Sequence, residues 1–140
     1  MTIVESLTEY FKTYPDLETK TIFVNFLKEN GQSFSIEPTA VRPVMQHFID
    51  GTYEKQFAFS LVGRFDYSQE LVMNIRNSEF FEELEEWVIS NNENDVLPDL
   101  DGYNAISLEI TSNGYLLGVS TDRKTGMYEI RFILTYDKGE

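Results

Sequence analysis

Residues Ile106 to Tyr136 constrain the possible fold more than any other part of this sequence. Apolar and polar residues alternate in two runs, residues 106–111 and 128–136, and this period is typical of strands with one buried face. Asn113-Gly114 follows the first run and is the strongest short-range signal for a two-residue hairpin turn, because both residues tolerate positive φ. The stretch therefore predicts a three-stranded antiparallel meander with one apolar face.

The turn and loop lengths predict the register of this meander. A two-residue turn at Asn113-Gly114 places Ile110 of the first strand opposite Leu117 of the middle strand. A four-residue loop from Asp122 to Thr125 then places Ile130 of the third strand opposite the same Leu117. A five-residue loop would turn the whole apolar face to solvent, so four residues are predicted. The residues of the meander expected in the core are Leu108, Ile110, Leu117, Val119, Ile130 and Phe132.

Two amphipathic helices are also predicted. Apolar residues recur at three- and four-residue steps from Thr2 to Tyr14, and Pro15 then ends the helix. Ser78 is a suitable N-cap for a second helix over Glu79–Ser90, preceded by a separate helical turn over Gln69–Asn74. The second helix has an apolar side expected to face the core: Phe80, Phe81, Leu84, Trp87 and Val88.

Shorter segments between the helices have strand character. Lys20–Leu27 is predicted to be a strand or an extended segment, and a short strand through residues 34–36 is expected to end at Pro38. From Pro38 to Pro43 the chain is expected to run extended at a sheet edge.

A further strand pair is predicted from Val44–Ile49 and Gln56–Phe65, joined through Asp50-Gly51. The register of this pair stays open, because the turn can also extend as far as residue 55. A two-residue turn would place His47 opposite Glu54, which makes a weak cross-strand charge pair.

The elements together predict an α+β fold formed by one domain over residues 1–140. We expect an antiparallel sheet, with a mixed sheet as the alternative, of five to six strands with the two helices on one face, in the order α-β-β-β-α-β-β-β. An apolar content of 41% and an aromatic content of 14% support a folded globule. The sequence has no cysteine and no apolar run long enough to span a membrane.

The charge of the chain limits its partners. Its formal net charge is −13, which argues against a surface that grips nucleic-acid phosphates. Nine acidic residues and no basic residue lie within Glu79–Asp101. This run is either a solvated helix face and loop or a surface that stays negative in an assembly.

The sequence lacks the motifs that carry catalysis, so we expect no enzyme, no cofactor and no metal site. There is no Gly-rich phosphate loop, no Gly-x-Ser-x-Gly elbow and no His-Glu-x-x-His pair. Residues 97–102 superficially suggest a calcium loop, but its first and twelfth ligand positions are Leu97 and Leu108. His47 is the single histidine, which makes a poor metal site without other ligands.

Five stretches of the chain, in their order and spacing, resemble one protein family. They are Phe34-Ser35-Ile36-Glu37-Pro38, Phe48-Ile49-Asp50-Gly51, Asn74-Ile75-Arg76-Asn77-Ser78-Glu79-Phe80, Thr111-Ser112-Asn113-Gly114-Tyr115-Leu116 and Tyr128-Glu129-Ile130-Arg131-Phe132. The combination resembles the small minor capsid proteins of siphophages and prophages of Gram-positive bacteria, which are similar to tail terminators. The resemblance spans residues 22–136, and it departs at Gly118-Val119, where the family pattern has an acid.

The resemblance implies a structural role in the virion, made in the bacterial cytoplasm and placed at the head–tail junction. Such a protein would close the tail tube and join it to the head as a ring, usually of six copies, in contact with tail-tube and connector proteins. It would bind no membrane and no specific nucleic acid, because a negative ring lets DNA slide without adhering. Leu116, Arg131 and Glu109 are the candidate subunit contact, expected together on the sheet face away from the core. The alternative is a small acidic cytoplasmic protein that stays monomeric and inhibits a partner by covering its basic site.

Overall fold

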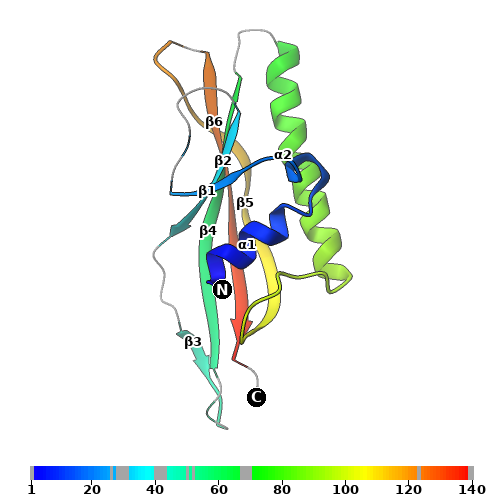
Figure 1. Cartoon of the computed structure of the whole chain (residues 1–140), viewed down its shortest axis with the longest axis vertical. Helices are drawn as coiled ribbons and strands as arrows, with labels where there is room; N and C mark the ends of the chain where they lie inside the picture. Colours follow the sequence, from blue (N-terminus) through cyan, green and yellow to red (C-terminus); the bar gives the residue numbers. More distant parts are fainter. Residues whose placement is uncertain are drawn as a thin grey trace.

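The protein is an α+β fold in which two helices lie on one face of a six-stranded mixed sheet (Figure 1). The computed structural model describes residues 2–25, 27, 32–39, 44–49, 51, 53–66, 71–122 and 124–138. The elements are α1 (Ile3–Phe11), a 3₁₀ turn (Pro15–Leu17), β1 (Ile22–Val24), β2 (Ser33–Thr39), β3 (Val44–His47), β4 (Tyr53–Asp66), α2 (Leu71–Glu93), β5 (Asn104–Val119) and β6 (Thr125–Asp137). The predicted fold class is confirmed, with four strands before α2 and two after it in place of three and three.

Strands β4 and β6 form the centre of the sheet. The sheet order is β1-β2-β4-β6-β5, with β3 paired to β4 and β1 parallel to β2. Antiparallel pairing of β4 and β6 is continuous from Glu54↔Asp137 to Asp66↔Thr125. Alternate residues of both strands point toward the helices, so Phe59 and Phe132 stack there with ring centroids 5.2 Å apart. The alternation read from residues 128–136 thus defines the buried face of the central strand.

Helix α1 anchors the N-terminal part of the chain across this aromatic face. The Thr2 side chain accepts a hydrogen bond from the Glu5 backbone N–H and caps the helix. Phe11 is fully buried and contacts Phe59 and Phe132 at centroid distances of 6.0 and 5.4 Å. The helix ends at Phe11, before the predicted Tyr14.

Helix α2 is one continuous helix of 23 residues. Ser78 therefore lies inside it, and the predicted cap there and the predicted break between a turn and a helix are wrong. Residues 69 and 70 of that predicted turn lie outside the described residues. Of the predicted apolar side, Phe81, Leu84 and Val88 are buried, whereas Phe80 and Trp87 are partly buried and pack against the core.

Strand β5 corrects the predicted meander. It is a single strand of 16 residues, so Asn113-Gly114 is a strand segment and forms no hairpin turn. A Cβ added at Gly114 would lie against Phe81 Cβ and 2.6 Å from Phe81 Cγ. Glycine at this position lets β5 approach α2 closely, and this contact explains the residue that the sequence pattern assigned to a turn.

The β5–β6 register also differs from the prediction. The connection runs through residues 120–124, with Val119 opposite Gly126 and Leu116 opposite Tyr128. Register shifts interrupt the pairing at four places along β5, because the longer strand carries extra residues in bulges. Two predicted core residues are wrong as a result: Leu117 is 49% exposed and Val119 is 39% exposed. Leu108, Ile130 and Phe132 are fully or almost fully buried, and Ile110 packs against the core as a partly buried residue.

The N-terminal strands are confirmed in outline and differ in detail. Strand β2 continues through Pro38, which pairs with Phe59 of β4, so the predicted end at Pro38 is wrong. In the β3–β4 pair, whose register the sequence left open, His47 lies opposite Tyr53 and Gln46 lies opposite Glu54, so the structure does not have the pairing of His47 with Glu54 that a two-residue turn would give. Of the extended edge expected from Pro38 to Pro43, residues 38 and 39 belong to β2, and residues 40–43 lie outside the described residues, as does Asp50 of the predicted turn.

Candidate self-association surfaces

The three residues predicted to form a subunit contact do not share one surface. Leu116 pairs with Tyr128 and therefore lies on the helix-bearing face of the sheet. Glu109 and Arg131 alternate with core residues on their strands and lie on the opposite face, where Glu109 pairs with Ile133. The bulges in β5 cause the difference, because each extra residue reverses the side to which the next side chain points.

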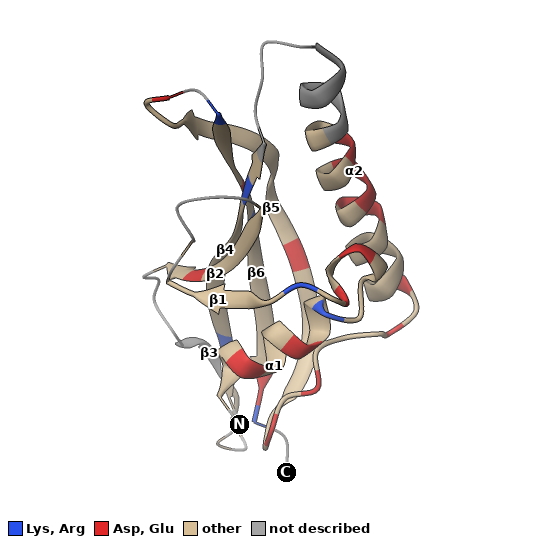
Figure 2. Cartoon of the chain, turned by 45° about the horizontal axis from the view of Figure 1, so that its top comes forward, with Lys and Arg blue, Asp and Glu red and all other residues tan. Residues whose placement is uncertain are grey.

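A different apolar surface is present at the end of the β5–β6 hairpin. We call residues 115–125 the hairpin tip; it diverges from α2 and projects from the body of the molecule (Figures 1 and 2). Leu116, Leu117 and Val119 are exposed there by 43, 49 and 39%. Leu116 and Val119 pair with Tyr128 and Gly126, which are two residues apart on β6, so both lie on the helix-bearing face. Leu117 lies between them and is also exposed, and we call these three residues the apolar patch, since single exposed leucines are ordinary but a group of them is a feature of interaction sites.

Hydrogen bonds within the turn hold the hairpin tip in shape. Ser120 N–H donates to the Thr125 carbonyl at 2.9 Å, and Thr125 N–H donates to Ser120 Oγ at 3.1 Å. Asp122 Oδ1 accepts from Ser120 Oγ at 2.6 Å and from Lys124 N–H at 3.0 Å. These hydrogen bonds, that from Ser120 first, lower the pKa of Asp122. The apolar patch is thus presented on a pre-ordered turn.

The hairpin tip is also electrically unlike the rest of the chain. No charged residue occurs from Ile110 to Thr121. Among the described residues of the tip, only Asp122 and Lys124 are charged, and their charges cancel in a chain of −13. The tip can approach an acidic surface with little electrostatic cost.

A groove runs between α2 and β5 on the side of the molecule away from the hairpin tip. This α2–β5 groove has a volume of about 380 Å³ and is lined by Ile89, Asn92, Glu93, Leu108, Glu109 and Ile110. Ile89 is 44% exposed at its rim. The floor is apolar, and the rim on α2 carries the exposed carboxylate of Glu93.

Side chains of α2 cover the free edge of β5 along this groove. Asn92 Oδ1 accepts from Leu108 N–H at 2.9 Å, and Asn92 Nδ2 donates to the Leu108 carbonyl at 2.5 Å. Farther along, Gly114 N–H donates to Glu85 Oε1 at 2.9 Å. These contacts occupy backbone groups that a neighbouring strand would otherwise use, and such cover is a common protection of edge strands.

The opposite face of the sheet holds a buried carboxylate that the sequence analysis did not single out. Glu129 accepts hydrogen bonds from Ser60 Oγ at 2.5 Å, Tyr115 OH at 2.7 Å and Arg131 Nε at 3.2 Å. Burial acts to raise the pKa of Glu129, but the hydrogen bonds from Ser60 and Tyr115 and the charge of Arg131 outweigh it and lower the pKa. Burial, followed by the charge of Glu129, raises the pKa of nearby Glu37. The cluster keeps Glu129 charged and joins three strands.

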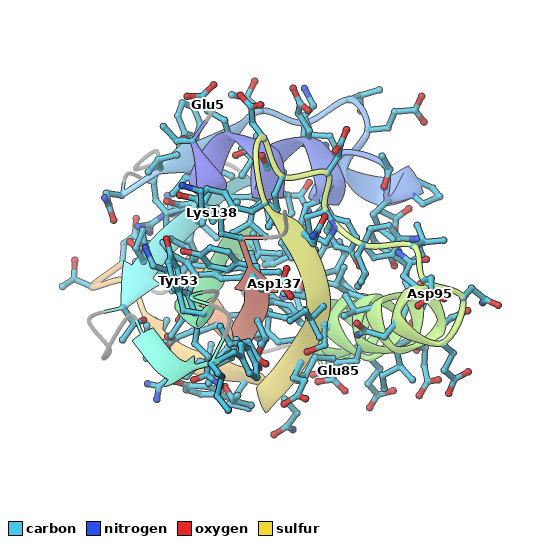
Figure 3. All side chains as sticks on the ribbon, turned by 90° about the horizontal axis from the view of Figure 1, so that it is seen from below. Glu5, Tyr53, Glu85, Asp95, Asp137 and Lys138 are labelled. Atoms are coloured by element: carbon cyan, nitrogen blue, oxygen red, sulfur yellow. The ribbon has the colours of Figure 1, made fainter. Side chains whose placement is uncertain are left out.

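The acidic run identified in the sequence forms the outer surface of α2. Acidic residues occur along the helix and in the segment after it, and most of their side chains are exposed (Figures 2 and 3). Glu85 is the exception, since it accepts a hydrogen bond from Gly114 N–H of β5. Among the described residues, no group of three or more His, Cys, Asp or Glu side chains is placed to hold a metal ion. The described helices also include none that is long and apolar enough to cross a membrane.

No protein-family model matches the sequence, and no curated protein matches it significantly.

Proposed function

We propose that this protein is a structural component of the phage head–tail junction, acting as a tail-completion or terminator protein that assembles with copies of itself into a ring. The observation that carries the proposal is the hairpin tip: an ordered, projecting, near-neutral turn with three exposed apolar side chains on a strongly acidic molecule. Surfaces of this kind are typical of assembly contacts. The resemblance to minor capsid and tail-terminator proteins supports the same role and suggests six copies.

The acidic surface of α2 suits a ring through which DNA passes. A negative lumen repels the DNA backbone and lets it slide without adhering. The same charge opposes self-association at low ionic strength, because the Debye length is about 30 Å at 0.01 M salt and falls to about 8 Å at 0.15 M. We therefore expect a monomer in dilute buffer, and rings at high salt, with Mg²⁺ or on a tail-tube template.

Size exclusion with light scattering across a salt and Mg²⁺ series tests this proposal. Leu117→Asp should abolish any ring, because it places a charge in the exposed apolar patch. Thr19→Asp is a matched control that adds the same charge at an exposed position outside both the hairpin tip and the α2–β5 groove. The ring is contradicted if the wild-type protein remains monomeric at every salt and Mg²⁺ concentration and also does not bind purified tail tubes.

One observation favours a second candidate, a monomeric acidic inhibitor. The outward surface of α2 concentrates carboxylates, and such a surface can cover a phosphate-binding site on a basic partner. The two candidates differ in oligomeric state, so the light-scattering series separates them.

A further inference from the structure

We propose that the occupant of the α2–β5 groove is the hairpin tip of a second copy of this chain. This inference rests on the proposed self-assembly and deepens it by naming both sides of the contact. The partner surfaces are different parts of the molecule, so the contact joins copies head to tail.

The apolar parts of the two surfaces match. The tip presents Leu116, Leu117 and Val119, and the groove offers Ile89 at its rim with partly buried Ile110 below it. Ile89 and the tip residues are exposed in the single molecule. Docking would remove these side chains from water together, and burial of apolar surface drives association.

The charges of the two surfaces also match. Exposed Lys124 belongs to the tip, whereas exposed Glu93 lines the groove and α2 continues the negative surface beside it. A tip-to-tip contact would lack this attraction, and a groove-to-groove contact would bring acidic rims together. Complementary charge therefore selects the second copy's tip as the occupant.

A tip cannot reach the groove of its own molecule. Leu116 and Ile110 belong to the same strand and are six residues apart, which corresponds to about 20 Å along an extended chain. Since β6 pairs with β5 on both sides of this interval, the strand cannot fold back on itself. The contact must be made between molecules.

Docking here uses side chains and does not extend the sheet. Asn92 already occupies both backbone groups of Leu108, and Glu85 occupies the N–H of Gly114. A strand added along this edge would have to displace them. A side-chain contact of this size is smaller than standard protein interfaces and hence weak, which agrees with association that depends on salt or a template.

Chemical cross-linking tests the contact directly, because the chain has no cysteine of its own. The variants Leu117→Cys and Ile89→Cys place thiols at the tip and at the groove rim, both at exposed positions. They are mixed under the salt conditions in which the wild-type protein associates, and treated with a short bis-maleimide. Ser90→Cys is the matched control for the groove, since it is exposed on the next residue of the same helix and points in another direction.

The expected result is a cross-linked dimer from the mixture of Leu117→Cys and Ile89→Cys, several-fold above the mixture with Ser90→Cys. Each variant alone should give only background, because a head-to-tail contact brings no two identical positions together. Efficient cross-linking of Leu117→Cys alone would overturn the inference in favour of tip-to-tip pairing. Associating wild-type protein without a tip-to-groove product would overturn it while leaving the ring proposal intact. A wild-type protein that never associates would overturn both.

A charge exchange provides a second measurement on folded protein. Lys124→Glu should weaken association by about two- to five-fold, the range for a single exposed ion pair. Glu93→Lys in the partner should restore it. If Lys124→Glu weakens association equally with the wild-type partner and with the Glu93→Lys partner, the tip does not dock beside Glu93.

Discussion

Replacing Gly114 with alanine tests the close packing of β5 against α2. The added methyl group would overlap Phe81, whose Cγ lies 2.6 Å from the new Cβ position. Overpacking of this kind costs about 1–3 kcal/mol, and the reduced freedom of the unfolded chain returns about 0.4–1 kcal/mol. We therefore expect a net loss of about 1.3 kcal/mol in the free energy of unfolding, within limits of about 0 and 2.6 kcal/mol, measured by urea denaturation followed by tryptophan fluorescence.

A double-mutant cycle identifies the cause of this loss. Phe81→Leu shortens the ring that Gly114→Ala would meet, so the double variant should lose less than the sum of the two single variants, by about 0.5–3 kcal/mol. A hairpin turn with Gly114 at positive φ would also be destabilised by alanine, but that cost would not depend on residue 81. Additive effects of the two changes would refute the packing argument.

Four further outcomes follow from the structure. Trp87→Ala should cost about 3 kcal/mol in urea melts, near the lower end for large aromatic residues because Trp87 is only partly buried; a loss under 1 kcal/mol would place it on the surface. Asn92→Ala should cost about 1–3 kcal/mol by leaving the buried backbone groups of Leu108 without partners, and Asn92→Asp should restore only the bond from the N–H; full stability in Asn92→Ala would rule out the edge contact. Tyr115→Phe removes a hydrogen bond to Glu129 and should raise the pKa of Glu129, measured by NMR titration; an unchanged titration would contradict the bond. A carboxyl group with a lowered folded pKa stabilises the fold only when ionised, so the variant should also lose less stability than the wild type as pH falls through that pKa. Gel shifts at about 150 mM salt should show no sub-micromolar binding to duplex DNA.

The alternating pattern of β6 was readable from sequence because its cause is local to the strand. Tyr128, Ile130, Phe132 and Leu134 all face the core, and a period of two residues in a central strand leaves one choice of buried face. Asn113-Gly114 was misread because a turn and a close helix contact favour the same small residue. The deciding neighbour, Phe81, is distant in sequence.

The surfaces were harder to predict than the core. The position of Leu116 depends on bulges in β5, and a bulge leaves no reliable mark in residue type. Asn92 and Glu129 act through partners 16 and 69 residues away, Leu108 and Ser60 respectively. Their sequence positions, a helix end and the polar side of a strand, are equally typical of solvated residues.

The central place of β6 has a consequence for how the chain reaches its native state. Strand β4 pairs with residues of β6 that are far away in sequence, such as Ser60 with Arg131. The whole of α2 and β5 lies between these two strands in the chain. Contacts of such separation form slowly because a long loop must close first. During synthesis, β4 stays unpaired along this side, and its apolar side chains stay exposed, until β6 has left the ribosome. The unfinished chain is thus exposed to aggregation over that interval, and the nine residues of α1 are too few to form a stable helix before the sheet is there to pack against.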